Sequence, residues 1–463
     1  STLSKIFGLW TDGGKSQGLT GAAANGLFGS KDEAAAPKVT EAEVKAADSE
    51  RKNLDKQLVE LALDEKQQAA IKERTQGLSG AALVQEMAAL KRAMSGPNAD
   101  RALATYSDLS KLAAMDPKAK ERLTPEVMAM MVSGVGDRRT DSDRGQSGIL
   151  GGRQARDSAQ GLLSMNDSDY KKTVELLHQA GTDKDGKEIP GADPHAEQAL
   201  ILKAIAARKQ QFKAVDEGAV DKVLGVLGLH DSPAAKAAKD LEGFAKDIRG
   251  TKRDELIRTT AVIDIDGAKD DDGLKQRYSH TCVPTTAQMV KGEADPIYAR
   301  KLNREGLGNL DTESETAKEQ RKELEAGNGQ AVSRQGAEDR AKVREGMVKL
   351  KEEGRLTPQQ QANLARYLRG WAPEKEDTVE DRNKAIAELR KVQGGHPTDA
   401  ELARIRDDGD KVGTGMDEQK GLNDIASSTT DINYQRTATK GNLESQQKEI
   451  DAALTDGQSV PFS

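Results

Sequence analysis

The single cysteine of the chain, Cys282, stands two residues before Pro284. Proline fits only the first turn of a helix, because it has no N–H to donate to the preceding turn. The spacing therefore predicts that a helix begins at Cys282. A thiol there meets unpaired backbone N–H groups and the positive end of the helix dipole, which stabilise the thiolate and lower the pKa of the thiol. The expected chemistry is attack of a thiolate on a carbonyl carbon.

Gln276 lies six residues before Cys282, close enough for a loop to fold its amide back toward the sulfur. The amide would then be a second donor to an oxyanion, beside the backbone N–H groups at the start of the helix. The plainer alternative is that Cys282 is a buried structural residue on a short helix. Both interpretations stay open, because a single cysteine excludes only a disulfide framework and a multi-cysteine metal site.

A glutamine six residues before a helix-opening cysteine, with Pro284 and Thr285 just after it, resembles the papain-like cysteine peptidases. The closest likeness is to the bacteriocin-leader-processing type and its relatives among bacterial secreted effectors and toxins, over residues 276–302. Val283 stands where that family more often has glycine. The resemblance implies that Cys282 is the nucleophile, that Gln276 helps to form the oxyanion hole, and that the substrate is a protein or peptide.

A thiol nucleophile also needs a base, normally a histidine that Asp or Asn orients. The chain has five histidines, and three of them are expected to lie on or beside ordinary helices. His178 follows an apolar helical face, and His195 stands in the first turn of a helix that Pro194 opens. His230 lies where a helix is expected to end. None of these three is predicted to be the base.

His280 and His396 are the remaining histidines. His280, two residues before Cys282, points away from the sulfur in an extended backbone, although its charge can bias the thiol toward the thiolate. His396 lies far downstream and has acidic residues behind it. Thr398 and Glu401 form a capping box, however, so His396 is predicted to stand in an ordinary approach to a helix.

The resemblance also implies where a base would come from. In papain-like folds the histidine lies on a strand of a small β-barrel after the helical half, and residues 456–462 look like the turn and first strand of that half. We therefore expect the nucleophile half of a peptidase, with a helical insertion over residues 311–454. The base would lie after Ser463, on another chain, or be absent. The chain would then be a fragment, a processed product or a degenerate copy.

Other polar patterns predict no further site. Residues 183–186 and 270–273 resemble pieces of a calcium loop but lack the glutamate needed at its twelfth position, so they are predicted to be turns. Asp264 and Asp266 alternate along a predicted strand, which places them on its solvent face. No glycine-rich phosphate loop is present. We expect no metal and no cofactor.

The elements that must position these residues are predicted to be helices. Aromatic residues make up 3% of the chain and charged residues 32%, and long β-branched runs are missing, which argues against a sandwich or a large parallel sheet. Helix starts are clear, such as the capping box of Thr40 with Glu43 and the pair Thr124-Pro125. The expected fold is mainly α, a multi-helix bundle or array with one very short strand element at residues 261–267.

Four segments follow from these signals. Residues 1–37 lack a hydrophobic period and are predicted to be a flexible N-terminal segment, and residues 38–260 form a helical domain. Residues 261–310 form a cysteine-helix module that resembles the papain-like nucleophile half. Residues 311–463 hold the helical insertion and the C-terminal segment, in which residues 407–440, rich in Gly, Asp, Ser and Thr, are predicted to be a loop.

Charge and hydropathy restrict the partners. The formal net charge is -7, without the basic surplus of a protein that follows phosphates, so nucleic acid is not expected. No apolar run is long enough for a membrane span, and the first residues do not form a standard signal peptide. We expect a cytoplasmic protein or one secreted by a specialised route. We expect the chain to be part of a papain-like cysteine peptidase with an effector- or toxin-like role. The alternative is a non-enzymatic helical structural, scaffold or delivery protein.

Overall fold

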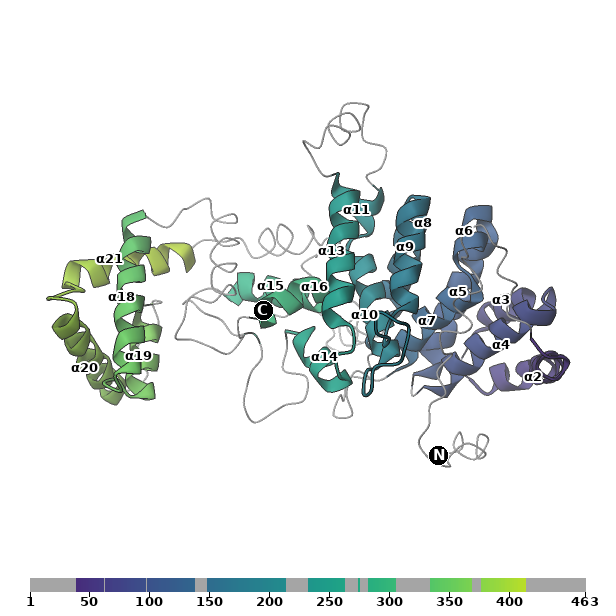
Figure 1. Ribbon diagram of the computed structural model, residues 1–463, viewed down its shortest axis with the longest axis horizontal. Coiled ribbons are helices and arrows are strands. Elements are labelled where there is room, and N and C mark those ends of the chain that lie inside the picture. Colours follow the sequence, from purple (N-terminus) through teal and green to yellow (C-terminus); the bar gives the residue numbers. More distant parts are fainter. Residues whose placement is uncertain are drawn as a thin grey trace, which may run out of the picture.

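The computed structural model describes residues 39–61, 63–96, 98–137, 148–213, 232–262, 274, 282–304, 334–368 and 376–413. These residues form eighteen helices, and their β structure is limited to two isolated bridges, Thr182 with Glu188 and Ala192 with Lys252 (Figure 1). The prediction of a mainly helical array is confirmed. Residues 1–37, predicted to be flexible, lie outside the described residues.

The first helices follow the capping signals of the sequence. Thr40 Oγ1 accepts the N–H of Glu43 at 3.2 Å and Glu43 Oε2 accepts the N–H of Thr40 at 2.7 Å, so the predicted capping box is present. Thr124 caps the helix that Pro125 opens, as predicted. The six helices are α2 (Glu41–Val59), α3 (Glu65–Gln76), α4 (Gly80–Ser95), α5 (Ala99–Met115), α6 (Pro117–Arg122) and α7 (Pro125–Gly136).

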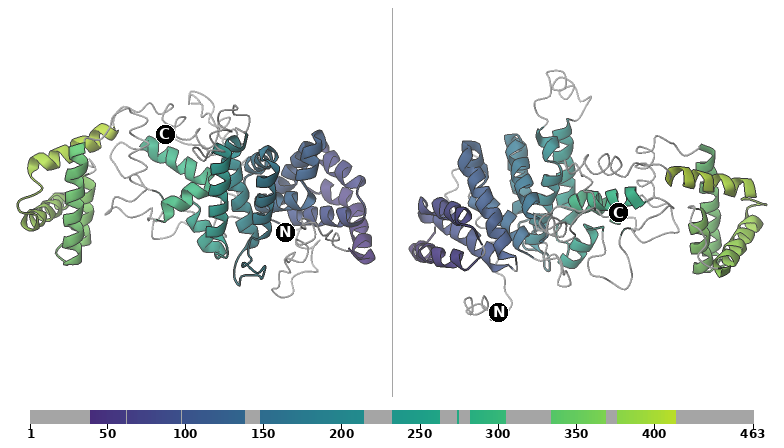
Figure 2. Two further views of the ribbon diagram at one scale, coloured as in Figure 1. Left: turned by 45° about the horizontal axis from the view of Figure 1, so that its top comes forward. Right: turned by 180° about the vertical axis from the view of Figure 1, so that it is seen from behind.

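The next helices complete the same core and follow one another along the array (Figure 2). They are α8 (Gly152–Ser164), α9 (Asp167–His178), α10 (Pro194–Ala207), α11 (Lys209–Lys213), α13 (Pro233–Ile248) and α14 (Arg253–Thr259). Ten of the fourteen residues of α10 are buried, because it packs against α7, α8 and α13 at once. Gly161 on α8 meets Ile205 of α10 so closely that an added Cβ would lie 2.7 Å from Ile205 Cγ2. α10 is therefore the central helix of the array.

The helix that begins at Cys282 and the helix that follows it form a small core, separate from the core of the array. α15 (Cys282–Ala294) and α16 (Pro296–Asn303) pack together. The buried apolar residues of this core are Val262 and Leu274, which precede α15, and Tyr298, Ala299 and Leu302 of α16, with Met289 of α15 packed against them. The predicted strand at 261–267 is described only at its first two residues, and neither is in a strand. The Val262 carbonyl accepts the Leu274 N–H at 2.7 Å, which fixes the chain there.

Four later helices make a separate group with a core of their own (Figure 1). They are α18 (Arg334–Glu352), α19 (Pro358–Leu368), α20 (Glu376–Val392) and α21 (Asp399–Gly413). The prediction that a loop begins at residue 407 is wrong, since α21 continues to Gly413. Asp407 and Lys411 stand at i and i+4, a spacing that favours helix despite the polar composition. Residues 414–440 of the predicted loop are outside the described residues.

Candidate functional site

α15 begins at Cys282, so the cysteine stands at a helix N-terminus as the sequence predicts. Pro284 is the third residue of the helix, within the first turn, where a missing N–H removes no helical hydrogen bond. The helix is 13 residues long, enough to carry the usual dipole with its positive end at the cysteine. Gln276, the second predicted site residue, lies outside the described residues.

The far end of α15 is held by a buried ion pair. Asp295 follows the helix directly, and its backbone N–H donates to the Lys291 carbonyl at 2.8 Å. Arg208, the residue that ends α10, donates from Nη1 to Asp295 Oδ1 at 2.8 Å and from Nη2 to Oδ2 at 3.0 Å. Arg208 is 8% exposed and Asp295 5% exposed. The last turn of the cysteine helix is thus joined to the central helix of the array.

The chain before Cys282 is attached to the same pair of helices. The N–H of Val262 donates to Glu293 Oε1 near the end of α15 at 2.9 Å, and Asn303 Nδ2 on α16 donates to the Ala261 carbonyl at 2.6 Å. Leu274 is 4% exposed and belongs to the core of α15 and α16. Val262 and Leu274 are therefore held beside the last turn of α15, at the end of the helix opposite to Cys282.

Two polar side chains on α15 are buried without hydrogen-bond partners. Gln288 is fully buried and neither Oε1 nor Nε2 is paired, and Thr285 is 4% exposed with its Oγ1 unpaired. With Cys282 they stand at i, i+3 and i+6, within about one third of the circumference of a helix of 3.6 residues per turn. Sequence reasoning overlooked them; the available signal was polar side chains at helical spacing from the cysteine.

His178 and His195 each make contacts at their own positions in the array. His178 Nε2 lies 3.0 Å from Glu126 Oε1. His195 Nδ1 lies 3.4 Å from Gln198 Oε1 in the first turn of α10. Burial, followed by the charge of nearby Arg92, lowers the pKa of His195 below its ordinary value. His195 is therefore neutral at pH 7, and its partner is an amide rather than a thiol.

A carboxylate cluster surrounds the start of α10. Asp193 Oδ1 accepts the backbone N–H groups of His195 at 3.0 Å and Ala196 at 3.1 Å. Arg253 bridges Asp193 Oδ2 at 2.6 Å and Asp137 Oδ2 at 2.9 Å. Burial alone would raise the pKa of Asp193, but the hydrogen bonds from Arg253 and Ala196 outweigh it and lower that pKa. The cluster caps a helix and joins α7, α10 and α14.

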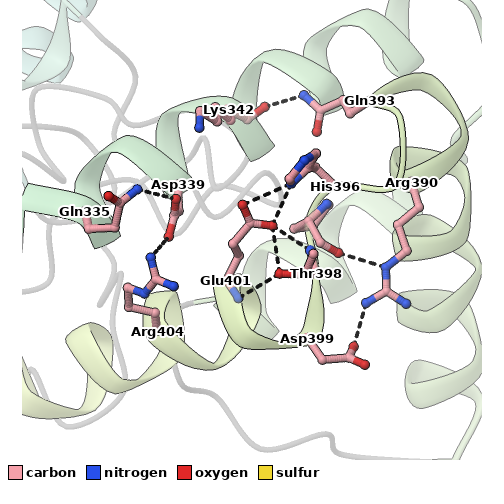
Figure 3. Close-up of polar contacts among 11 residues, drawn as sticks. Gln335, Asp339, Lys342, Arg390, Gln393, His396, Thr398, Asp399, Glu401 and Arg404 are labelled. Carbon is pink, nitrogen blue, oxygen red and sulfur yellow. Dashed lines mark hydrogen bonds and ion pairs between the residues drawn. The ribbon is translucent and has the colours of Figure 1, made fainter.

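His396 lies in the group of α18–α21 and pairs with Glu401, as Figure 3 shows. His396 Nδ1 is 2.9 Å from Glu401 Oε2, which also accepts the Thr398 N–H at 2.6 Å. The Thr398 hydrogen bond and then His396 lower the pKa of Glu401 to about 2. The predicted capping box is present, with His396 as an additional partner of its glutamate. The remaining two histidines, His230 and His280, are outside the described residues.

The acidic turn near residue 183 is built from its own backbone. Asp183 Oδ1 accepts the N–H groups of Asp185 and Lys187, each at 2.9 Å, which makes this segment a turn, as predicted. Within the part of the chain that the structure describes, no group of three or more His, Cys, Asp or Glu residues could hold a metal ion. Residues 263–273, with the other acidic patterns, are not described. Among the described helices, none is both long and apolar enough to cross a membrane.

Comparisons with protein-family models, with curated proteins and with solved structures find no match to this chain.

Proposed function

We propose that this chain carries the nucleophile of a papain-like cysteine peptidase, with Cys282 as the attacking thiolate and a protein or peptide as substrate. The observation that carries the proposal is the start of α15 at Cys282, with Pro284 in its first turn. A sulfur there receives the field of the helix dipole and of N–H groups that no helical carbonyl accepts. Those groups favour the thiolate and can also hold the oxyanion that its attack creates.

Gln276 is the proposed second oxyanion donor. Its support is the spacing of six residues between this amide and Cys282, short enough for a loop to bring the two together. An amide donor next to the helix N–H groups would complete a two-donor oxyanion site, the kind of arrangement that stabilises a tetrahedral intermediate.

The proposed peptidase is incomplete within the described residues, because none of their three histidines is assigned as its base. His178, His195 and His396 contact Glu126, Gln198 and Glu401 respectively. The base would come from another segment or another chain, and without it the thiolate would acylate readily on activated substrates only. The proposal includes an effector- or toxin-like role in a bacterium, in the cytoplasm or after secretion by a specialised route.

The second candidate is a non-enzymatic helical structural, scaffold or delivery protein. The observation that favours it is the same set of histidine contacts, since two of the three histidines support helix starts rather than a nucleophile. On this view Cys282 is a small apolar residue that happens to open a helix.

Alkylation of the only thiol across pH tests both candidates. Iodoacetamide modification followed by intact mass should give an apparent pKa for Cys282 at least one unit below that of the same protein in denaturant, which lies near the ordinary value of about 8.5. An equal pKa in the native and denatured protein would contradict the peptidase proposal and favour the scaffold.

A matched pair of glutamine variants tests the oxyanion site. Acylation of Cys282 by p-nitrophenyl acetate, followed by mass spectrometry, should be slower by about 10²-fold in Gln276→Ala, the effect of removing one oxyanion donor. Gln160→Ala, a change at an exposed residue of α8, is the control and should leave the rate unchanged. Equal rates in both variants would remove Gln276 from the site but leave Cys282 as the nucleophile.

A further inference from the structure

Two arginines from neighbouring helices contact one aromatic ring, that of Tyr367 on α19. The guanidinium carbon of Arg382 on α20 lies 4.4 Å from the centre of this ring, and that of Arg406 on α21 lies 4.7 Å from it. The two cations are therefore less than twice 4.7 Å apart. Such a separation is no more than about one Debye length at physiological salt, so their repulsion is only partly screened. Tyr367 packs against the core of the α18–α21 group, which holds the ring that both cations share.

Neither arginine forms an ion pair with any residue that the structure describes. Arg382 donates from Nε and Nη2 to Asn383 Oδ1, at 3.2 and 3.1 Å, which leaves Nη1 open. That amide oxygen is neutral, so it does not balance the charge. Arg406 Nε is buried and has no hydrogen-bond partner. A buried donor without an acceptor costs free energy, which a ligand with acceptor oxygens would restore.

Three other arginines of the same helix group show the more usual arrangement. Each contacts a carboxylate oxygen at 3.1 Å or less: Arg355 with Glu353 and Glu388, Arg390 with Asp399, and Arg404 with Asp339. A carboxylate thus neutralises each of these cations. The two arginines on Tyr367 depart from this pattern, and an external anion would supply the missing negative charge.

A further unused donor lies on the same face of α19. Asn363 stands one turn before Tyr367, at the i and i+4 spacing, and is 7% exposed. Its Oδ1 accepts Gln359 Nε2 at 3.3 Å, while its Nδ2 is buried and unpaired. The groups left open on and around Tyr367 are therefore N–H donors, which favour a ligand rich in acceptor oxygens.

We propose that Arg382 and Arg406, held on the ring of Tyr367, bind the phosphate group of a phosphate monoester. Such a group carries a charge of about −1.5 to −2 at pH 7 and three acceptor oxygens, so one group matches two cations. A carboxylate brings one charge and two oxygens. The planar fork of a guanidinium also suits two oxygens of a phosphate at once. The site is independent of the proposed function, since none of its residues belongs to α15.

Isothermal titration calorimetry of the full chain with inorganic phosphate tests the site. At about pH 7.5, where phosphate is mostly dianionic, and at constant ionic strength, binding should be saturable with a Kd of about 1 mM or tighter. Arg382→Met and Arg406→Met should each weaken it about tenfold or more, the value of a hydrogen bond to a charged group. Arg355→Met removes the same charge from an exposed arginine that already has carboxylate partners, and should leave the affinity unchanged.

Two further comparisons keep the test decisive. Arg406→Lys retains the charge but not the planar fork, so it should weaken binding by less than Arg406→Met and covers the case in which a methionine variant folds poorly. Circular dichroism should show the same helix content in every variant. Acetate should bind at least about tenfold more weakly than phosphate.

The source of the phosphate group follows from two larger probes. Tighter binding of a phosphoserine peptide than of glycerol 3-phosphate would assign a phosphorylated protein as the ligand, and the reverse order would assign a small phosphate ester. Absence of saturable phosphate binding, or equal affinity in Arg382→Met, Arg406→Met and Arg355→Met, would overturn the site. Acetate binding as tight as that of phosphate would overturn its assignment to a phosphate group.

Discussion

Arg122 and Tyr170 hold each other at two points. The Tyr170 hydroxyl donates to the Arg122 carbonyl at 2.7 Å, and the Arg122 guanidinium lies 4.6 Å above the centre of the Tyr170 ring. Nη1 of the same guanidinium donates to the carbonyls of Leu162 at 2.8 Å and Met165 at 2.7 Å, which end α8. One arginine from α6 therefore caps α8 and stacks on α9, and it satisfies carbonyls that the helix itself leaves unpaired.

Loss of this arginine should destabilise the array. Arg122 is only 3% exposed, and its removal leaves buried carbonyls without donors. Arg122→Met, which keeps the apolar stem, should lower the free energy of unfolding by about 2–4 kcal/mol. Arg258→Met, at an exposed residue of α14, is the matched control and should stay within about 0.5 kcal/mol of the unmodified protein. Urea unfolding followed by circular dichroism measures both.

The buried hydroxyl of Tyr170 should make stability fall at high pH. Burial raises the pKa of Tyr170 from 10.0 to about 12. Because the folded state then holds its proton more tightly than the unfolded state, the contribution is complete below pH 10 and is lost as pH rises through about 12. A shift of two units corresponds to about 3 kcal/mol at most.

Tyr170→Phe isolates this effect because it removes the titrating group. At pH 8 the variant should be less stable by about 1 kcal/mol, the value of one hydrogen bond. Between pH 10 and 11.5 the difference between the two proteins should shrink or reverse in urea unfolding. A constant difference across that range would show that the pKa of Tyr170 is the same in both states.

Glycine at the α8–α10 contact should resist substitution. A Cβ at Gly161 would lie 2.7 Å from Ile205 Cγ2 and 3.3 Å from the Ile205 carbonyl oxygen, so the helices would have to separate. Gly161→Ala should cost about 1–3 kcal/mol through overpacking, despite the better helix propensity of alanine. Gly243 on α13 has nothing within 4 Å of an added Cβ. Gly243→Ala should therefore stabilise the protein by about 0.5–1 kcal/mol. Thermal unfolding of both variants checks that their changes in stability have opposite signs.

The buried, unpaired amide of Gln288 allows a test of whether the surroundings of α15 provide a polar partner for this side chain. Replacement of a buried unpaired polar group by an apolar one of similar shape removes a desolvation penalty, so Gln288→Met should be neutral or more stable by about 1–2 kcal/mol. Gln288→Glu, nearly identical in shape, should be strongly destabilising because it buries a charge. A loss of stability in Gln288→Met would mean that the amide has a partner in the folded protein.

Local signals were enough to predict the helix starts, including the one that places Cys282. Thr40 with Glu43, Pro125 and Pro284 all act within one turn of their own position, so the sequence contains the whole interaction. The Arg208–Asp295 pair joins residues 87 apart, and no spacing rule links them. The buried Gln288 was overlooked for the same reason, because burial depends on which distant helices cover a face.

α21 shows how composition misled the prediction of a helix end. Residues after Ile405 include several aspartates and a glycine, which indicate a loop when they are counted over a window. The helix nevertheless continues to Gly413. Its start is well fixed by Thr398 and Glu401, and in the sequence Asp407 and Lys411 have the i, i+4 spacing that favours helix. A secured N-terminus and charge spacing outweighed average composition.

The capping glutamate of α21 should make the α18–α21 group sensitive to acid. The Thr398 N–H and then His396 lower the pKa of Glu401 from 4.5 to about 2, so the folded state favours the ionised carboxylate. The resulting stability is present above pH 4.5 and is lost as pH falls through about 2. Glu401→Gln should therefore be less stable than the unmodified protein at pH 6, and the difference should diminish between pH 4.5 and 2.5.

Urea unfolding followed by circular dichroism measures this difference in stability at each pH. Glu345→Gln, a change at an exposed residue of α18, is the charge-matched control. If the Glu401→Gln difference stays constant down to pH 2.5, the ionised form of Glu401 does not support the cap, and the neutral hydrogen bonds with Thr398 account for its strength.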